Sequence, residues 1–159
     1  ELASTLSNLG GVYWSEGRYK DALPLYERTR TIFEHTLDPF HPNMASILNN
    51  LAETYWKLHR YKEAEPLFRR ALAIKEARLT KGNPSIATTL NGLAGMLRDE
   101  GRNAEAEVAY QRALEIRKSA LDPGDASIAE TVKDYAVQLR STNRAREAEE
   151  LMRSNGVAR

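Results

Sequence analysis

The sequence predicts an all-α fold, a right-handed superhelical solenoid of antiparallel helix hairpins. Two observations lead to this prediction. The first is an internal repeat of 42 residues, because a fixed period of about 20 to 50 residues is typical of solenoids. The second is the spacing of apolar residues inside each repeat, which alternates between three and four and is typical of amphipathic helices.

The repeat runs through the chain without gaps. Leu2, Met44, Ile86 and Ile128 occupy equivalent positions 42 residues apart. Blocks 44–85 and 86–127 share 16 identical residues out of 42, spread along the whole block. We predict one domain over residues 1–159, with repeats 2–43, 44–85, 86–127 and 128–155, the last truncated as a C-terminal cap. Because the first repeat begins with its apolar stripe intact, we also expect further repeats or a capping segment before residue 1.

Each repeat opens with a helix that carries one apolar stripe. The stripe positions are Leu6, Leu9, Gly10 and Tyr13; Leu48, Leu51, Ala52 and Tyr55; Leu90, Leu93, Ala94 and Leu97; and Val132, Tyr135, Ala136 and Leu139. The third position is small in every repeat, which lets a neighbouring helix approach closely. We therefore expect these stripes to form the core.

A second helix follows in each repeat, with Ala22 and Tyr26 in its stripe and Ala64 and Phe68 at the equivalent positions. Pro24 and Pro66 also recur at one repeat position. Proline is tolerated only near the start of a helix, where the backbone amide has no partner. The prolines therefore predict that the second helices begin no earlier than about residues 19 and 61.

The two helices of a repeat are joined at Gly17, His59, Gly101 and Asn143, residue types that tolerate or favour the left-handed conformation that ends a helix. This position gives His59 a structural role.

The connections between repeats end in helix-start signals. Asn83 and Asp125 are N-cap candidates, His41 holds the same position in the first connection, and Pro42 and Pro84 suit the first helical position.

Composition excludes several functions. The 23 basic and 22 acidic residues leave a net charge of +1, which gives no electrostatic basis for binding nucleic acid. The chain has no cysteine and three scattered histidines, so no metal or other cofactor is expected. No apolar run is long enough to span a membrane. No paired nucleophile and base indicates an enzyme. We expect a cytoplasmic, non-enzymatic protein that binds neither membranes nor nucleic acid.

The order of small residue, turn glycine, alanine and aromatic residue, as in Gly10, Gly17, Ala22 and Tyr26, resembles the tetratricopeptide repeat (TPR) signature. That repeat usually spans about 34 residues. The 42-residue period, the segment Leu48-Asn49-Asn50-Leu51-Ala52 and the linker 38–42 are similar to the longer repeats of kinesin light chains. The resemblance covers the whole chain and implies that first helices line a concave groove that binds proteins. HEAT and armadillo repeats have similar periods, but the alanine and aromatic pattern argues against them.

The faces opposite the apolar stripes carry the candidate site. They hold small residues, amides and tryptophans, a composition closer to an interface than to an idle surface. The candidate groove residues are Trp14, Asn49, Glu53, Trp56, Arg98, Lys133 and Arg140, together with Asn91. The resemblance matches Asn49 and Asn91 to the asparagines of the kinesin light chain repeat. Such amides can pair with the backbone of any extended peptide, or they can instead bond the neighbouring repeat and fix its stacking.

The sequence therefore predicts a scaffold that binds a peptide segment of a partner protein. Arg98, Lys133 and Arg140 make the C-terminal part of the groove mildly basic, so we expect a ligand with an acidic stretch. The alternative function is a structural module that self-associates through its open N-terminal repeat face. Size that depends on concentration without a ligand would distinguish the alternative.

Overall fold

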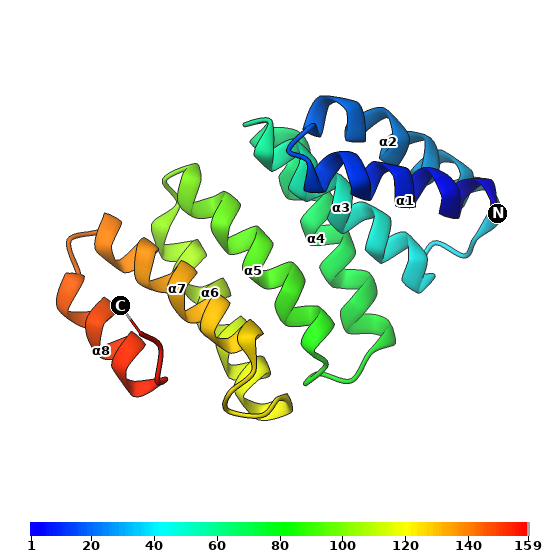
Figure 1. Cartoon of the computed structure of the whole chain (residues 1–159). Coiled ribbons are helices and arrows are strands. Elements are labelled where there is room, and N and C mark those ends of the chain that lie inside the picture. Colours follow the sequence, from blue (N-terminus) through cyan, green and yellow to red (C-terminus); the bar gives the residue numbers. More distant parts are fainter. Residues whose placement is uncertain (159) are drawn as a thin grey trace. The chain divides into compact units, whose positions relative to one another are not determined.

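The computed structural model describes residues 1–158, and these residues form eight helices and no strand (Figure 1). The helices are α1 (Leu2–Ser15), α2 (Tyr19–Thr36), α3 (Pro42–Lys57), α4 (Tyr61–Arg78), α5 (Pro84–Asp99), α6 (Asn103–Ala120), α7 (Ala126–Ser141) and α8 (Ala145–Ser154). The predicted all-α class is confirmed. The chain divides into two compact units, Glu1–Leu79 and Thr80–Arg159, and each is described by itself.

The first unit consists of two helix hairpins, α1 with α2 and α3 with α4, and α2 packs against α3. The second unit is built in the same way: α5 packs with α6 and α7 with α8, while α6 and α5 both contact α7. The helices of each hairpin run antiparallel (Figure 1). Helices α3, α5 and α7 begin 42 residues apart, as do α2, α4 and α6, so the sequence period appears directly in the helix positions.

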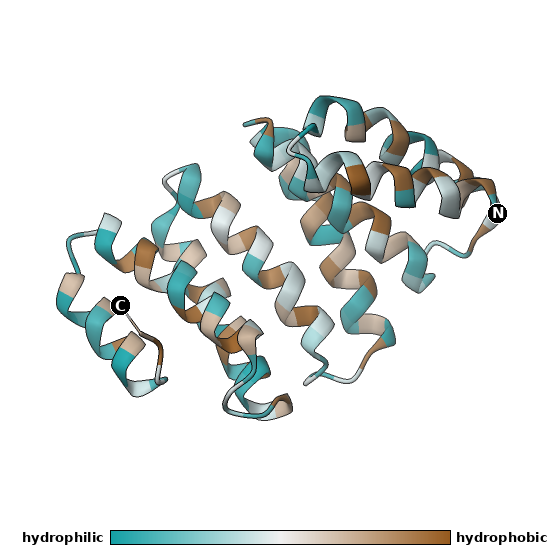
Figure 2. Ribbon diagram, in the orientation of Figure 1, coloured by the Kyte–Doolittle hydropathy of each residue, from teal (hydrophilic) through white to brown (hydrophobic). Residues whose placement is uncertain are grey.

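Most of the predicted apolar stripes lie in the core. Apolar and polar residues alternate along every ribbon in Figure 2, as expected for amphipathic helices. Leu48, Leu51 and Ala52 are fully buried, and Leu93 and Tyr135 are nearly so. Leu9 is an exception, because 42% of its surface is exposed. The prediction for Leu9 was wrong because, within residues 1–79, no hairpin covers α1 on the side where α2 covers α3.

All four predicted turn residues adopt the left-handed conformation. The φ angles are +74° at Gly17, +59° at His59, +84° at Gly101 and +61° at Asn143. In each turn the next residue bonds back to the end of the first helix, as in the 2.9 Å bond from the Arg60 amide to the Tyr55 carbonyl. These bonds satisfy carbonyl groups that the helix end would leave unpaired. The structural role of His59 is confirmed.

The predicted helix starts are also confirmed. Asn83 Oδ1 accepts a hydrogen bond from the Ser85 amide at 2.9 Å, and Asp125 Oδ1 accepts one from the Ser127 amide at 2.8 Å. His41 acts in the same way through Nδ1, at 3.1 Å from the Asn43 amide. Proline holds the first position of α3 and α5. Each cap satisfies one amide of the first helical turn.

The prolines of the second helices require a correction. Helices α2 and α4 begin at Tyr19 and Tyr61, as predicted, but Pro24 and Pro66 lie inside them. The amide of the sixth helical residue would normally bond the carbonyl of the second, so the explanation by an unpaired amide was wrong. The prolines are tolerated because they lie on the exposed face, as do Lys20 and Lys62, whose carbonyls lose this bond.

An arginine at the start of every second helix was missed by the sequence analysis. Each arginine pairs with a carboxylate three residues later: Arg18 with Asp21, Arg60 with Glu63, Arg102 with Glu105, and Arg144 with Glu147, at 2.7–2.9 Å. The 42-residue recurrence of arginine followed by an acidic residue was the available signal. These exposed pairs orient the turn and contribute little stability individually.

Candidate interaction surface

In the first unit, the predicted residues Asn49 and Glu53 lie next to each other on α3. Asn49 Nδ2 donates a hydrogen bond to Glu53 Oε1 at 2.9 Å, and Asn49 is only 7% exposed. Glu53 also interacts with Tyr26 of α2 and Lys75 of α4. Burial raises the pKa of the Tyr26 hydroxyl, and Glu53 adds to that rise. Burial lowers the pKa of the Lys75 ammonium, which Glu53 opposes. A half-buried polar cluster therefore surrounds Glu53.

The two predicted tryptophans are half-buried on α1 and α3. The Trp14 ring packs edge-on against Tyr19, with 5.7 Å between centroids. Its Nε1 is buried and makes no hydrogen bond to any described residue. Lys57 Nζ lies 4.4 Å from the ring centre of Trp56, a cation–π contact. Both rings therefore have structural neighbours and retain partial exposure.

In the second unit, Asn91 joins two hairpins. Asn91 Nδ2 donates to Asp134 Oδ2 at 2.8 Å, which connects α5 to α7. Its Oδ1 is buried and accepts no hydrogen bond from the described residues. The amide nitrogen of Asn91 is thus bonded to the neighbouring hairpin, whereas the amide oxygen has no hydrogen-bond donor among the described residues. A buried acceptor in this state is unfavourable unless a ligand or water supplies the missing donor.

Arg98 lies two turns further along α5 and is held by several groups. Its guanidinium donates to Asp99 Oδ1 at 2.8 and 2.9 Å and to the Tyr110 hydroxyl at 3.4 Å. Burial acts to lower its pKa, but Tyr110, Asp99 and Asp134 together outweigh burial and raise it. Burial has the opposite effect on the Tyr110 hydroxyl and raises its pKa. Arg98 is therefore a fixed, permanently charged group.

Helix α7 presents the most accessible part of the candidate surface. Glu130, Lys133, Val137 and Arg140 form one exposed stripe with spacings of three, four and three, and Val137 is 49% exposed. Glu130 is paired with Arg117 at 3.2 Å. Lys133 and Arg140 make no ion pair with any residue in the range 1–158. Arg140 Nη2 donates to Met152 Sδ at 3.3 Å. The stripe therefore combines an apolar side chain with two cations that form no ion pair.

The candidate residues predicted from the sequence all lie on first helices, and the contribution of the second helices was not predicted. Tyr26, Lys75 and Tyr110 reach the first-helix groups that the sequence singled out. The available signal was the aromatic position held by Tyr26, Phe68 and Tyr110 in the first three repeats. Two of these three residues carry a hydroxyl group. Tyr26 and Tyr110 are otherwise core residues, exposed by 3% and 0%.

The described residues include neither a metal-binding cluster nor a membrane-spanning helix. Within residues 1–158 no group of three or more histidine, aspartate or glutamate side chains is placed to hold a metal ion. No helix in that range is long and apolar enough to cross a membrane. The first-helix faces instead offer amides, cations and partly exposed rings, which are groups that bind other molecules by hydrogen bonds and charge.

A model of the tetratricopeptide repeat family matches residues 1–77 and 85–154. No curated protein matches the sequence significantly. Among solved structures, a Podospora anserina protein described as a kinesin light chain with nearly identical TPR-like repeats superposes with a TM-score of 0.86. The two proteins are 23% identical over 96% of this chain and 72% of the other.

Two further solved structures are similar. BtubC (BKLC) from P. vanneervenii has a TM-score of 0.87 at 23% identity, covering 98% of this chain and 62% of that protein. MamA has a TM-score of 0.67 at 16% identity, covering 96% and 70%. These likenesses show the fold. They confirm the predicted solenoid class and, at the level of the fold, the resemblance to kinesin light chain-like repeats.

Proposed function

This chain belongs to the tetratricopeptide repeat family, and from that premise we propose that it is a scaffold that binds an extended peptide of a partner protein in a groove lined by its first helices. The TPR fold generally mediates protein–protein interactions and is a non-enzymatic scaffold. The peptide and its chemistry are the part that we propose.

The observation that carries the proposal is the exposed stripe on α7. Lys133 and Arg140 are seven residues apart, so they lie about 10.5 Å apart along the helix axis. An extended polyproline II segment places side chains i and i+3 on one side at about 9 Å. Two acidic side chains at that spacing match the two cations, and an apolar residue between them meets Val137. The proposed ligand is therefore a peptide with acidic residues three apart.

Peptide display on the intact chain tests this chemistry. Enrichment of peptides with paired acidic residues is expected, and enrichment of basic peptides would overturn the proposal. Replacing both Lys133 and Arg140 by alanine should weaken binding of an enriched peptide roughly tenfold, because two exposed ion pairs are lost. The matched control replaces Lys81 and Lys118, two exposed cations away from the α7 stripe, and should bind like the wild type.

The role of Asn91 is tested by a pair of variants. Asn91→Ala and Asp134→Ala each remove the same 2.8 Å hydrogen bond, so both should lower the melting temperature to a similar extent. If Asn91 also binds the peptide backbone, Asn91→Ala weakens peptide binding more than Asp134→Ala does. Equal affinities in the two variants would assign Asn91 to stacking alone.

A second candidate function is self-association through the N-terminal face. The observation in its favour is the exposure of Leu2, Leu9 and Val12 on α1, at 54%, 42% and 51%. Helix α1 contains no charged residue, and depletion of charge is typical of interface cores. Sedimentation without ligand over a range of concentrations tests this function: a rise in apparent mass supports it, and a constant monomer contradicts it.

A further inference from the structure

The exposed face of α1 is the same face that other first helices bury. The residues 42 positions after Leu2, Leu9 and Val12 are Met44, Leu51 and Thr54 of α3, and each of them is 1% exposed or less. In α7 the equivalents are Ile128, Tyr135 and Gln138, exposed by 4%, 6% and 1%. In each unit this face is covered by the second helix of the preceding hairpin, α2 on α3 and α6 on α7.

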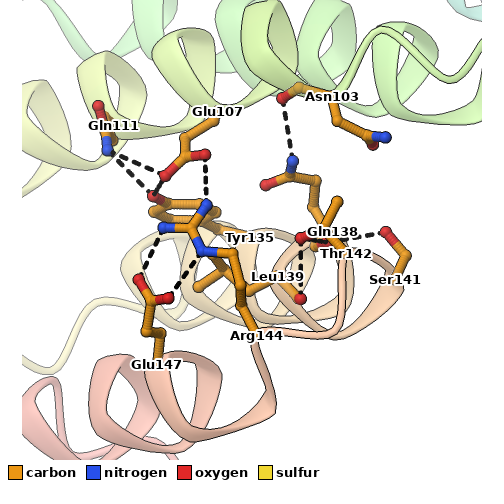
Figure 3. Close-up of polar contacts among 10 residues, drawn as sticks. All are labelled: Asn103, Glu107, Gln111, Tyr135, Gln138, Leu139, Ser141, Thr142, Arg144 and Glu147. Atoms are coloured by element: carbon orange, nitrogen blue, oxygen red, sulfur yellow. Dashed lines mark hydrogen bonds and ion pairs between the residues drawn. The ribbon is translucent and has the colours of Figure 1, made fainter.

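The contact between α6 and α7 shows in detail which residues cover this face (Figure 3). The Tyr135 ring stacks on Tyr110 at 5.7 Å, and its hydroxyl donates to Glu107 Oε1 at 2.8 Å and accepts from Gln111 Nε2 at 3.0 Å. One position of a first helix therefore rests on three positions of the second helix before it.

The same three positions recur on α8, where they hold Glu149, Met152 and Arg153. These three residues line a hollow of about 540 Å³ on the C-terminal hairpin. Met152 is only 5% exposed, so the accessible apolar lining comes mainly from Val157 and Ala158, and Arg146 and Glu150 complete the rim. The two cations and two anions of the lining cancel in charge. The last hairpin thus carries an open acceptor surface of the kind that α6 uses to hold α7.

We propose that the α1 face of one copy, formed by Leu2, Leu9 and Val12, docks in the α8 hollow of a second copy. This inference rests on the self-association proposed above and names the surface that receives α1. Leu9 takes the place on α8 that Tyr135 has on α6 and packs on the apolar lining of the hollow, formed mainly by Val157 and Ala158. Because Leu9 has no hydroxyl group, it needs no counterpart of the Glu107 hydrogen bond. Leu2 and Val12 bury further apolar surface, which drives the association.

Docking of this kind is heterologous, because the two surfaces differ, and it can therefore repeat from copy to copy. Pairing of α1 with α1 of another copy is the competing arrangement. The repeat favours α8, because a first-helix face is covered by a second helix in both units that the structure describes. Within residues 1–79 no hairpin covers the α1 face, and within residues 80–158 none covers the α8 hollow.

The absence of cysteine from the chain permits a direct test by cross-linking. One batch carries Leu9→Cys, and a second, ¹⁵N-labelled batch carries Arg153→Cys. The two are mixed, treated with a short bismaleimide and weighed by mass spectrometry. We expect cross-linked pairs of mixed mass. In the control, Val108→Cys, at a position 65% exposed on α6, replaces Arg153→Cys, and the yield of mixed-mass pairs should be several-fold lower. Leu9→Asp in the otherwise unchanged chain should shift sedimentation to the monomer.

Each other outcome overturns a defined statement. A majority of Leu9→Cys pairs of equal mass would show that α1 meets α1, which overturns the α8 acceptor and leaves self-association intact. Cross-linking no higher than the Val108→Cys control would overturn both, and the α1 face would then belong to a hairpin or partner other than this chain. Peptide display with the Lys133 and Arg140 variants of α7 tests the groove separately.

Discussion

At the scale of single residues, the close approach of helices within a hairpin depends on small side chains. Gly10 of α1 faces the ring of Tyr26, and a Cβ atom at Gly10 would lie 2.7 Å from Tyr26 Cε1. The ring is buried and cannot move aside without disturbing the core. This contact explains the glycine at the third stripe position of α1.

The adjacent glycines 10 and 11 give a matched prediction. Gly10→Ala should lower the free energy of unfolding by about 1–3 kcal/mol because of overpacking. Gly11→Ala should raise it by about 0.5–1 kcal/mol, because alanine favours the helix and its Cβ would lie 3.7 Å from the Tyr26 hydroxyl, an ordinary contact. Urea denaturation of both variants measures the difference. Equal effects would contradict the role assigned to Tyr26.

Glu107 forms a charged contact between α6 and Arg144, the residue before α8. Arg144 donates to its Oε2 at 2.6 Å and also bonds Glu147 (Figure 3). The hydrogen bond from Arg144 lowers the pKa of Glu107, burial opposes this, and the Tyr135 hydroxyl adds to the lowering. The carboxylate therefore stabilises the fold above its ordinary pKa, and this stabilisation is lost as the pH falls through the lowered value.

Glu107→Gln should consequently lower the free energy of unfolding at pH 7 by up to about 1 kcal/mol, since the ion pair is partly screened by solvent. The difference from the wild type should shrink as the pH falls below the ordinary glutamate pKa of 4.5, because the wild-type carboxylate is then protonated as well. Denaturation curves between pH 3 and pH 7 provide the measurement. Glu115→Gln, on the exposed side of α6, is the control. A difference that persisted in acid would rule out the carboxylate charge as its cause.

At the scale of elements, one repeat position serves different purposes in different helices. Leu9 and Leu51 are equivalent, but Leu9 is 42% exposed and Leu51 is fully buried. The difference arises because α2 covers α3, whereas the described part of the chain has no helix that covers α1 in the same way.

Leu51→Ala should therefore cost about 2–5 kcal/mol, as other buried leucine truncations do. Leu9→Ala should cost no more than about 1 kcal/mol, because little apolar surface is lost from the core. Thermal or urea unfolding at low protein concentration, where self-association does not contribute, separates the two. A large cost for Leu9→Ala under these conditions would mean that α1 is covered even in the monomer.

Much of this architecture could be predicted from the sequence, and the failures have physical causes. The period, both helices of each repeat, the left-handed turns and the caps are local features, so the residues at those positions specify them. The exposure of Leu9 depends on what covers it, which a repeat pattern does not contain. The position of Pro24 depends on whether water can reach the carbonyl of Lys20. Partners of the candidate residues, such as Asp134 for Asn91, lie 43 residues away and emerge only from packing.

At the scale of the whole molecule, burial is greatest away from the chain ends. Helix α1 has three buried residues and α3 has nine; α8 has two and α7 has seven. In a repeat protein each hairpin is stabilised by packing against its neighbours, so a helix with few buried residues opens more easily.

Native-state hydrogen exchange should therefore be faster in α1 and α8 than in α3 and α7, within their respective units. Mass spectrometry after exchange at neutral pH measures this order, and uniform protection along the chain would contradict it. Exchange in α1 and α8 should slow together as protein concentration rises if the α1 face and the α8 hollow meet between copies.

The four left-handed turns have a consequence for how such an array tolerates mutation. Gly17 and Gly101 adopt that conformation freely, whereas His59 and Asn143 adopt it at a cost of roughly 1 kcal/mol relative to glycine. Since neighbouring hairpins share stability, a loss in one turn is compensated by the packing of the next hairpin. A tandem array can thus accumulate sequence differences between its repeats, including new groups on its surface, while every repeat keeps the same backbone.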